Sequence, residues 1–454
     1  MKEPTTLNDP ALSASAEARI FPRLLVAALF LVMAARLLWM IARNQVDLLY
    51  YDEWDLYRKF IPHPTSPWLG LFLYQPGPHR QGIGYILMEW IAAASHWNTR
   101  TMSFAVAVFT AGAAPLALVL KQRLFGPLTC SDVIIPLLFL APIQYEIFLG
   151  AANLPTTSLP VFLFMVYALA WTMRNTAWRY FSVLIVNFLL IYCGYGFFAG
   201  ILTPLLLSLD LARSLRQGRD PSQPVIAMLV ALASLASFFV GYRFLPAAEC
   251  FRFPFHPIVN YFWFVALMFS NLVRLKGHGL APTIVGLALL ALAITIFVNN
   301  LCGAWRIDPK RNGDYVMIAL TGFSLLYAAN AAIGRVCFGV EYGQSSRYGP
   351  YLFPVFLAFY FAVLELRPQP RRTLTLAIYI VTLAIAAIFL APRDRRTIAY
   401  YHDGKASWKA CYLQRKDFVT CTRETGFAIY PNPSSVQIRR ELDYMQQNDL
   451  NLFH

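Results

Sequence analysis

The chain has 454 residues, of which 58% are hydrophobic and only 14% are charged, and its formal net charge is +14. Soluble globular proteins carry about 25% charged residues, so this composition excludes an ordinary soluble enzyme and indicates a polytopic membrane protein. The basic residues are spread over short hydrophilic loops, a pattern that is typical of loops beside anionic lipid and not of a nucleic-acid interface. We therefore expect membrane lipids, and no nucleic acid, among the partners.

Apolar segments recur along the chain and predict an all-α polytopic membrane fold with about eleven transmembrane helices. The segments lie at about 22–43, 101–121, 132–149, 156–173, 180–193, 197–211, 223–242, 280–300, 314–334, 348–366 and 373–391. With the N-terminus in the cytoplasm, every short inside loop is basic, as the positive-inside rule requires. An odd number of spans then places the C-terminus outside, in the periplasm.

Two further apolar segments are expected to lie at the outer membrane face as interfacial or re-entrant helices. These are 82–96, within a first outer loop of about 44–100, and 258–273, within a large outer loop at 243–279. Counting 258–273 as a span would move the three basic residues of the loop 301–313 outside and would break the charge rule.

The expected domain organisation is a transmembrane domain, 1–391, followed by a small periplasmic tail, 392–454, that is too short to make a convincing independent domain. Cys411 and Cys421 lie ten residues apart in this tail, and we expect them to pair if the tail faces an oxidising compartment. The alternative is that both are small buried hydrophobic residues.

The first outer loop holds the strongest candidates for chemistry. Asp52, Glu53 and Asp55 lie among aromatic residues just after the first span, where carboxylates are costly to desolvate and are usually functional. Adjacent helical residues point about 100° apart, so only one of Asp52 and Glu53 can face a given pocket. His79 and Arg80 follow in the same loop. The plainer interpretation is an aromatic anchor at the interface with merely solvated acids.

A later outer segment adds Arg335, Arg347 and Tyr348. Two arginines in a short outer loop depart from the charge preference, and the planar guanidinium suits phosphate oxygens. The alternative is that these arginines extend to phospholipid headgroups. Glu146 lies in an apolar segment near its outer end, where an ionisable side chain is a functional candidate, although a structural hydrogen bond between helices is as well founded.

With these residues in place, the layout resembles the GT-C superfamily of polytopic glycosyltransferases, whose members have a cytoplasmic N-terminus, an acidic motif in the first outer loop and interfacial helices there. Asp52-Glu53 stands where the family carries its acidic pair. Short motifs similar to those of uncharacterised bacterial membrane proteins occur at 51–54, 78–80, 144–146, 334–335 and 346–348. Two positions depart from that pattern, because Pro78 replaces an acid and Ile147 replaces an asparagine.

The resemblance implies a bacterial inner-membrane glycosyltransferase that moves a sugar from a polyprenyl-phosphate-linked donor to a glycan, lipid or protein acceptor, by a single inverting displacement on the periplasmic side. Asp52 would act as the base, with Glu53 or Asp55 orienting it. The implied donor-phosphate and substrate-binding residues are His79, Arg80, Glu146, Arg335, Arg347 and Tyr348.

Some relatives use a divalent cation and others use none, so the sequence leaves metal use open. Two rival functions remain at this point. One is an O-antigen polymerase or ligase, which relies on arginines in late outer loops. The other is a non-catalytic transporter or flippase for lipid-linked sugars.

Overall fold

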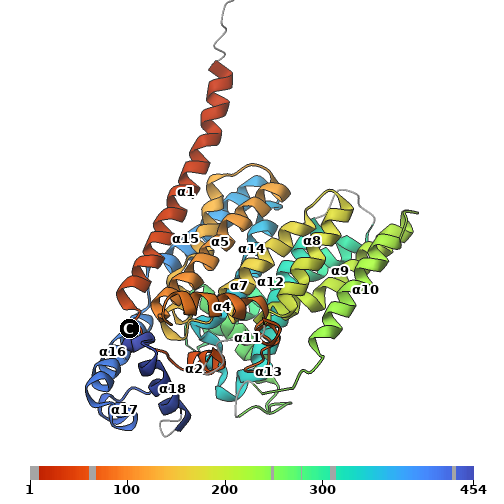
Figure 1. Cartoon of the computed structure of the whole chain (residues 1–454). Coiled ribbons are helices and arrows are strands. Elements are labelled where there is room, and N and C mark those ends of the chain that lie inside the picture. Colours follow the sequence, from red (N-terminus) through yellow and green to blue (C-terminus); the bar gives the residue numbers. More distant parts are fainter. Residues whose placement is uncertain (1–9, 61–67, 247–249, 278, 307–312, 432–435) are drawn as a thin grey trace, which may run out of the picture.

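A computed structural model describes residues 10–60, 68–246, 250–277, 279–306, 313–431 and 436–454, and the regular elements in these ranges are helices, with no strand. Figure 1 shows the helices gathered into one bundle, with the start of α1 (Pro10–Asn44) extending beyond it. Within the described ranges, seven helical segments are long and apolar enough to cross a membrane, by length and composition. These are Ile20–Asn44, Thr99–Phe125, Gly194–Arg216, Leu280–Trp305, Gly313–Phe338, Ser346–Leu364 and Gln369–Arg415. The fold is therefore consistent with a polytopic membrane protein.

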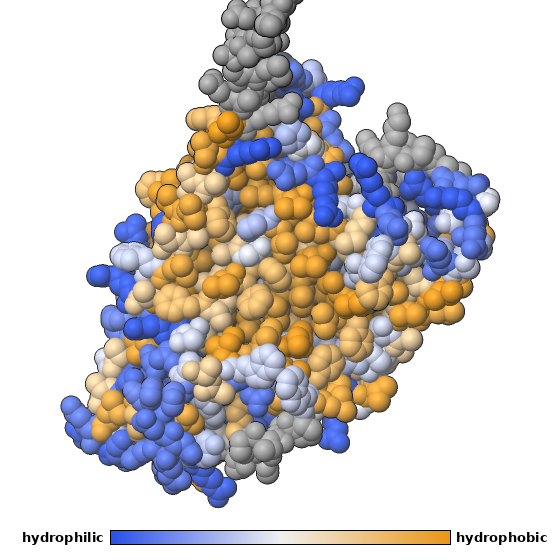
Figure 2. Space-filling view, turned by 45° about the horizontal axis from the view of Figure 1, so that its top comes forward, coloured by the Kyte–Doolittle hydropathy of each residue, from blue (hydrophilic) through white to orange (hydrophobic). Residues whose placement is uncertain are grey.

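The surface of the bundle agrees with that interpretation. Figure 2 shows a broad hydrophobic band across the middle of the molecule, with hydrophilic residues gathered at its upper and lower ends. Large apolar side chains such as Leu31 on α1, Leu229 on α10 (Ser222–Phe238) and Ile378 on α15 (Gln369–Ile388) are more than half exposed. Such a band is the surface expected to contact lipid, because large exposed apolar patches are rare on soluble monomers.

Seven of the eleven expected spans coincide with the long helices, and three others form shorter apolar helices. The long ones are α1, α5 (Thr99–Phe125), α9 (Phe197–Arg216), α12 (Leu280–Trp305), α13 (Gly313–Arg335), α14 (Gly349–Leu364) and α15. The shorter ones are α7 (Ser158–Trp171), α8 (Thr176–Ile191) and α10. The tight break predicted between α8 and α9 is present at Gly194–Gly196.

The single helix expected over 132–149 is not present. Helix α6 covers only Ile134–Phe139 and is followed by a 3-10 turn that begins at Pro142 and a π-helical turn at Glu146–Gly150. Proline has no N–H with which to continue the hydrogen-bond ladder of a helix. The side-chain amide of Gln144 donates to the carbonyl of Phe139, the last residue of α6, at 2.7 Å, which stabilises the break.

The bundle has two chemically different ends. At the basic end, the predicted inside loops meet: Arg216 donates to the carbonyl of Trp305 at 2.7 Å, and Arg123 donates to Thr172 Oγ1 at 3.0 Å. At the cavity end, the predicted first outer loop, the segment 336–348 and the C-terminal tail come together. The first outer loop contributes α2 (Asp52–Tyr57), α3 (Trp68–Phe72) and α4 (Gly82–Ala94).

Helix α11 (Val259–Leu272), in the segment expected to be interfacial, begins and ends at the cavity end. Cys250, which precedes it, is bonded to Cys337, and Arg274, which follows it, donates to Asp394 at 2.6 Å. At 1.5 Å per residue its 14 residues span about 21 Å, less than the roughly 30 Å of a hydrocarbon core. Its depth in a bilayer stays a prediction.

The tail is part of the cavity end and not a separate appendage. It contains α16 (Pro392–Arg415), α17 (Phe418–Thr425) and α18 (Val436–Gln447). Tyr51 donates its backbone N–H to the carbonyl of Ile429 at 2.8 Å, and the amide of Asn451 donates to Asp47 at 2.7 Å. The disulfide predicted between Cys411 and Cys421 is present, whereas the Cys250–Cys337 bond was not anticipated.

Candidate functional site

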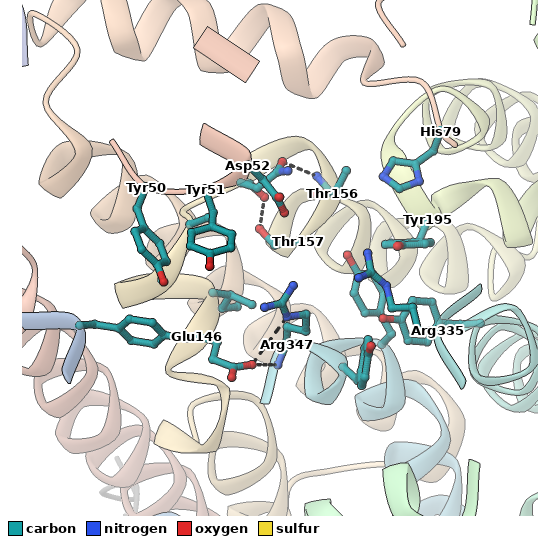
Figure 3. A pocket seen from close by; sticks show the side chains of 18 residues that line it. Tyr50, Tyr51, Asp52, His79, Glu146, Thr156, Thr157, Tyr195, Arg335 and Arg347 are labelled. Atoms are coloured by element: carbon teal, nitrogen blue, oxygen red, sulfur yellow. Dashed lines mark hydrogen bonds and ion pairs between the residues drawn. The ribbon is translucent and has the colours of Figure 1, made fainter. Parts of the chain in front are cut away.

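A cavity of about 320 Å³ lies at the cavity end, between the first outer loop, the 146–157 segment, α13, the 346–351 segment and α16. We call it the main cavity; Figure 3 shows its lining side chains. It brings together six of the nine predicted site residues: Asp52, His79, Glu146, Arg335, Arg347 and Tyr348. The three that it leaves out are Glu53, Asp55 and Arg80.

Asp52 and Glu53 have opposite environments, as adjacent positions on a helix require. The Asp52 side chain is exposed, lines the main cavity and has no hydrogen-bond or ion-pair partner among the described residues. Glu53 is fully buried, and its carboxylate accepts the backbone N–H groups of Tyr50 at 2.8 Å and Ala152 at 2.9 Å. Glu53 therefore fixes the backbone that presents Asp52.

A buried lysine from the tail, Lys405 on α16, supports the same region. Its ammonium group donates to the carbonyls of Leu149 and Gly150, both at 2.9 Å, and lies over the ring of Tyr50. Burial raises the pKa of Glu53 and lowers that of Lys405, while the attraction between the two charges opposes both shifts. No local pattern in the sequence points to Lys405, because these two carbonyl partners lie more than 250 positions away in the chain.

Asp55 and Arg80 are engaged elsewhere. Asp55 forms an ion pair with Arg58 at 3.0 Å and accepts the hydroxyl of Tyr430 at 3.1 Å. Arg80 is 3% exposed and donates to the carbonyls of Leu73 at 2.9 Å and Phe238 at 3.0 Å, and also to that of Val240. It thus satisfies carbonyl groups at the end of α10, which indicates a structural role and not contact with a donor phosphate.

The two remaining arginines reach the main cavity from the later outer segment. Glu146 holds Arg347: its carboxylate accepts the Arg347 backbone N–H at 3.1 Å and lies 3.7 Å from Nε. Ser345 completes this arrangement, because its hydroxyl donates to Glu146 and accepts from Arg347 Nε at 3.2 Å. Arg335, the last residue of α13, has no hydrogen-bond or ion-pair partner within the described ranges.

Tyrosines form the wall around Arg335. The rings of Tyr327 and Tyr351 stack at 4.0 Å, and Tyr195 packs edge-on against both at 5.0 and 5.1 Å. The hydroxyls of Tyr348 and Tyr351 are buried and lack a hydrogen-bond partner in the described part of the chain. Buried polar groups in folded proteins are nearly always paired, so these hydroxyls are candidates for binding a ligand.

His79 closes the cavity on the side of the first outer loop. Its ring lies 4.5 Å from that of Tyr195 (Figure 3). Burial, together with the charge of Arg335, lowers the pKa of His79 to about 4. The imidazole is therefore neutral at pH 7 and has one nitrogen that can accept a hydrogen bond.

Two smaller cavities adjoin the main one. The basic side cavity, of about 310 Å³, shares Glu146, Arg347 and Tyr401 with it. The polar side cavity, of about 220 Å³, shares Asp52, His79, Asn153 and Arg335 with it. The basic side cavity adds Tyr145, Lys276, Glu341, Tyr342, Gln344, Ser345, Arg393 and Thr397, and the polar side cavity adds Asp55, Leu56, Pro76, Gly77, Pro78, Gln81 and Pro246.

The described residues contain no group of three or more His, Cys, Asp or Glu side chains placed to hold a metal ion. No protein-family model matches the chain, and no curated protein matches it significantly.

Proposed function

We propose that this protein is a GT-C-type membrane glycosyltransferase that moves a sugar from a polyprenyl-phosphate-linked donor to a cell-envelope glycan, lipid or protein. One observation carries the proposal. An unpaired carboxylate, Asp52, and two guanidinium groups, Arg335 and Arg347, line the same cavity. An inverting transfer from a lipid phosphate requires two elements: a general base, and a site with positive charge for the leaving phosphate. Asp52 can supply the first, and the two guanidinium groups can supply the second.

In the proposed reaction, Asp52 takes the proton of the acceptor hydroxyl as the oxygen attacks the anomeric carbon of the donor sugar. The bond between that carbon and the phosphate oxygen breaks on the opposite face, so the configuration inverts. The lipid phosphate leaves with the bonding electrons, and Arg335 and Arg347 stabilise its increased negative charge. Glu146 positions Arg347, and the tyrosine wall packs against the sugar.

The sidedness of the cysteines supports a periplasmic location for the cavity end in a bacterial inner membrane. Both disulfides found in the described residues lie at the cavity end, whereas Cys130 and Cys302, near the basic loops, are free and exposed. Disulfides persist in oxidising compartments such as the periplasm, and basic loops favour the cytoplasmic side. Eleven crossings, with the N-terminus inside and the C-terminus outside, remain part of this proposal.

The test is Asp52→Asn. We expect it to preserve the membrane level of the protein and to lower transfer by roughly 100-fold or more, the scale of a general base. Transfer is followed as radiolabel that moves from extracted polyprenyl-phosphate-linked sugars to the endogenous acceptor. The membranes come from a strain that lacks the chromosomal gene and expresses either the parent protein or the variant. Asp443→Asn, on the exposed face of α18, is the matched control and should transfer normally.

Normal transfer by Asp52→Asn would refute the role of this carboxylate. It would favour the second candidate, a lipid-linked polysaccharide polymerase or ligase, because Arg335 and Arg347 lie in a late outer segment as such an enzyme requires. In that case Arg335→Ala would abolish transfer while Asp52→Asn would not. Movement of lipid-linked sugar across the bilayer without any transfer would instead favour a flippase.

A further inference from the structure

The polar side cavity contains a buried acceptor group with no partner. Gln81, at the start of α4, is 2% exposed, and its side-chain oxygen Oε1 is buried without a hydrogen bond among the described residues. The Gln81 backbone is fixed, since its N–H donates to Tyr74 at 3.1 Å and its carbonyl accepts from Tyr85 at 3.2 Å. The residue lines the polar side cavity, so a donor bound there is the natural partner for this oxygen.

The same cavity also contains spare donor capacity. The side-chain oxygen of Asn153 accepts the Thr156 N–H at 3.2 Å, but its amide nitrogen makes no hydrogen bond to any described residue. Two residues with unused hydrogen-bonding capacity, Gln81 with an acceptor and Asn153 with a donor, therefore line one cavity of about 220 Å³. Hydroxyl groups both donate and accept, so they match this pair better than a group that can do only one.

The two side cavities are lined by different charges, so each favours a different kind of ligand. The basic side cavity is lined by Lys276, Arg347 and Arg393, which favours an anionic group. The polar side cavity is lined by two carboxylates, Asp52 and Asp55, with a single cation, Arg335. An anionic ligand would be repelled by Asp52, whereas a neutral one would not.

We propose that the polar side cavity binds a neutral, hydroxyl-rich sugar unit, and that this unit belongs to the acceptor, which is therefore a glycan. The inference rests on the proposed function and names its acceptor. Asp52 borders both cavities, so a hydroxyl of a sugar held beside Gln81 can meet the carboxylate on one side while the donor occupies the main cavity on the other. Gln81 and Asn153 are binding residues in this scheme, with no part in proton transfer.

Binding is tested on the purified full-length protein in nanodiscs, without any transfer reaction. The probes are the methyl glycosides of glucose, galactose, mannose and N-acetylglucosamine, followed by saturation-transfer difference NMR. We expect at least one to bind, and we expect Gln81→Met, which keeps the size of the side chain but removes its amide, to weaken that binding about 5- to 10-fold. Gln81→Asn, which keeps the amide but shortens its reach, should weaken it as well.

Gln144→Met is the matched control. Gln144 is also fully buried with an unpartnered Oε1, but it lines none of the three cavities. Because this variant also loses the hydrogen bond to the Phe139 carbonyl, its folded fraction is measured first, and glycoside binding per folded protein should stay unchanged. The proposal is overturned if no methyl glycoside binds, if both Gln81 variants bind like the parent protein, or if Gln144→Met weakens binding equally. These outcomes are independent of Asp52→Asn, so the failure of this inference and the failure of the proposed function can be told apart.

Discussion

Two charged clusters at opposite ends of the helix bundle differ in how their charges are paired. Towards the basic end, Asp132 pairs with Lys121 at 3.0 Å and accepts the hydroxyl of Tyr360 at 2.7 Å, and neither side chain of this ion pair lines the main cavity or its two side cavities. At the cavity end, Asp52 and Arg335 line the main cavity and make no hydrogen bond or ion pair to any described residue. Fully paired charges help to hold a fold together, whereas charges without an ion pair beside a cavity are free to meet a ligand, so the difference supports the proposed site at the cavity end.

The largest expected effect breaks the paired end. Asp132→Asn removes the counter-charge of Lys121, whose side chain is 2% exposed, and should destabilise the protein by about 3–5 kcal/mol. Asp52→Asn removes no contact within the described residues and should change stability by less than about 0.5 kcal/mol. Unfolding in detergent, followed by circular dichroism for both variants, checks this. Equal losses would mean that the two ends do not differ as described.

The next effect concerns the unpaired cation. Arg335→Ala should lower transfer about 100- to 1,000-fold, the range seen when one stabilising donor is removed from a site of developing negative charge. Arg335→Lys should restore activity only in part, because an ammonium group lacks the bidentate fork. Arg216→Ala, which removes an arginine stacked on Trp305 at the basic end, is the control and should keep transfer near normal. A similar loss in both alanine variants would argue for a general stability effect.

The comparison of the two ends also explains what could be predicted from the sequence. Local sequence patterns were enough to predict the long apolar helices and the Gly194–Gly196 break. They also predicted that only one of the adjacent residues Asp52 and Glu53 would face a pocket. The break at 134–150 was missed because its apolar residues resemble a span, and the break is stabilised by the Gln144 side chain, which donates to the carbonyl at the end of α6.

Long-range packing accounts for what was missed at the site. Arg80 looked like a phosphate ligand beside His79, but it donates to two carbonyls at and just beyond the end of α10, about 160 residues away in the chain. Tyr401 lines the main cavity and Lys405 supports its wall, yet both belong to a tail that seemed a small appendage. A sequence gives residue types and spacing, and these contacts depend on how distant segments meet.

A smaller effect concerns the cysteines of the two ends. Removing the Cys411–Cys421 bond by a double Cys→Ala change should destabilise the tail by about 2–3 kcal/mol, the range for a short closed loop. A membrane-impermeant thiol reagent added to intact spheroplasts should label neither Cys411 nor Cys130 without reduction, and after reduction should label the half-buried Cys411 but not Cys130. Labelling of Cys130 from outside would reverse the proposed orientation and place the cavity in the cytoplasm.

The smallest expected effect is the pH dependence that His79 gives to the cavity end. Its pKa is lowered to about 4 in the folded protein, so between about pH 4 and 6.5 the unfolded chain binds more protons at this position than the folded one. Stability therefore rises with pH across that window, and acidification from pH 7.5 to 5.5 removes part of it. One pH unit within the window corresponds to at most about 1.4 kcal/mol, and because the side chain is half-buried, screening should reduce this to about 0.5 kcal/mol.

The test is His79→Gln, whose side chain cannot be protonated. This variant should lose correspondingly less stability over the same acidification, measured as unfolding free energies at the two pH values. If the variant lost as much unfolding free energy as the parent protein, His79 would have an ordinary pKa in the folded state. The proposal that its neutral imidazole accepts a hydrogen bond from the substrate at pH 5.5 would then be wrong.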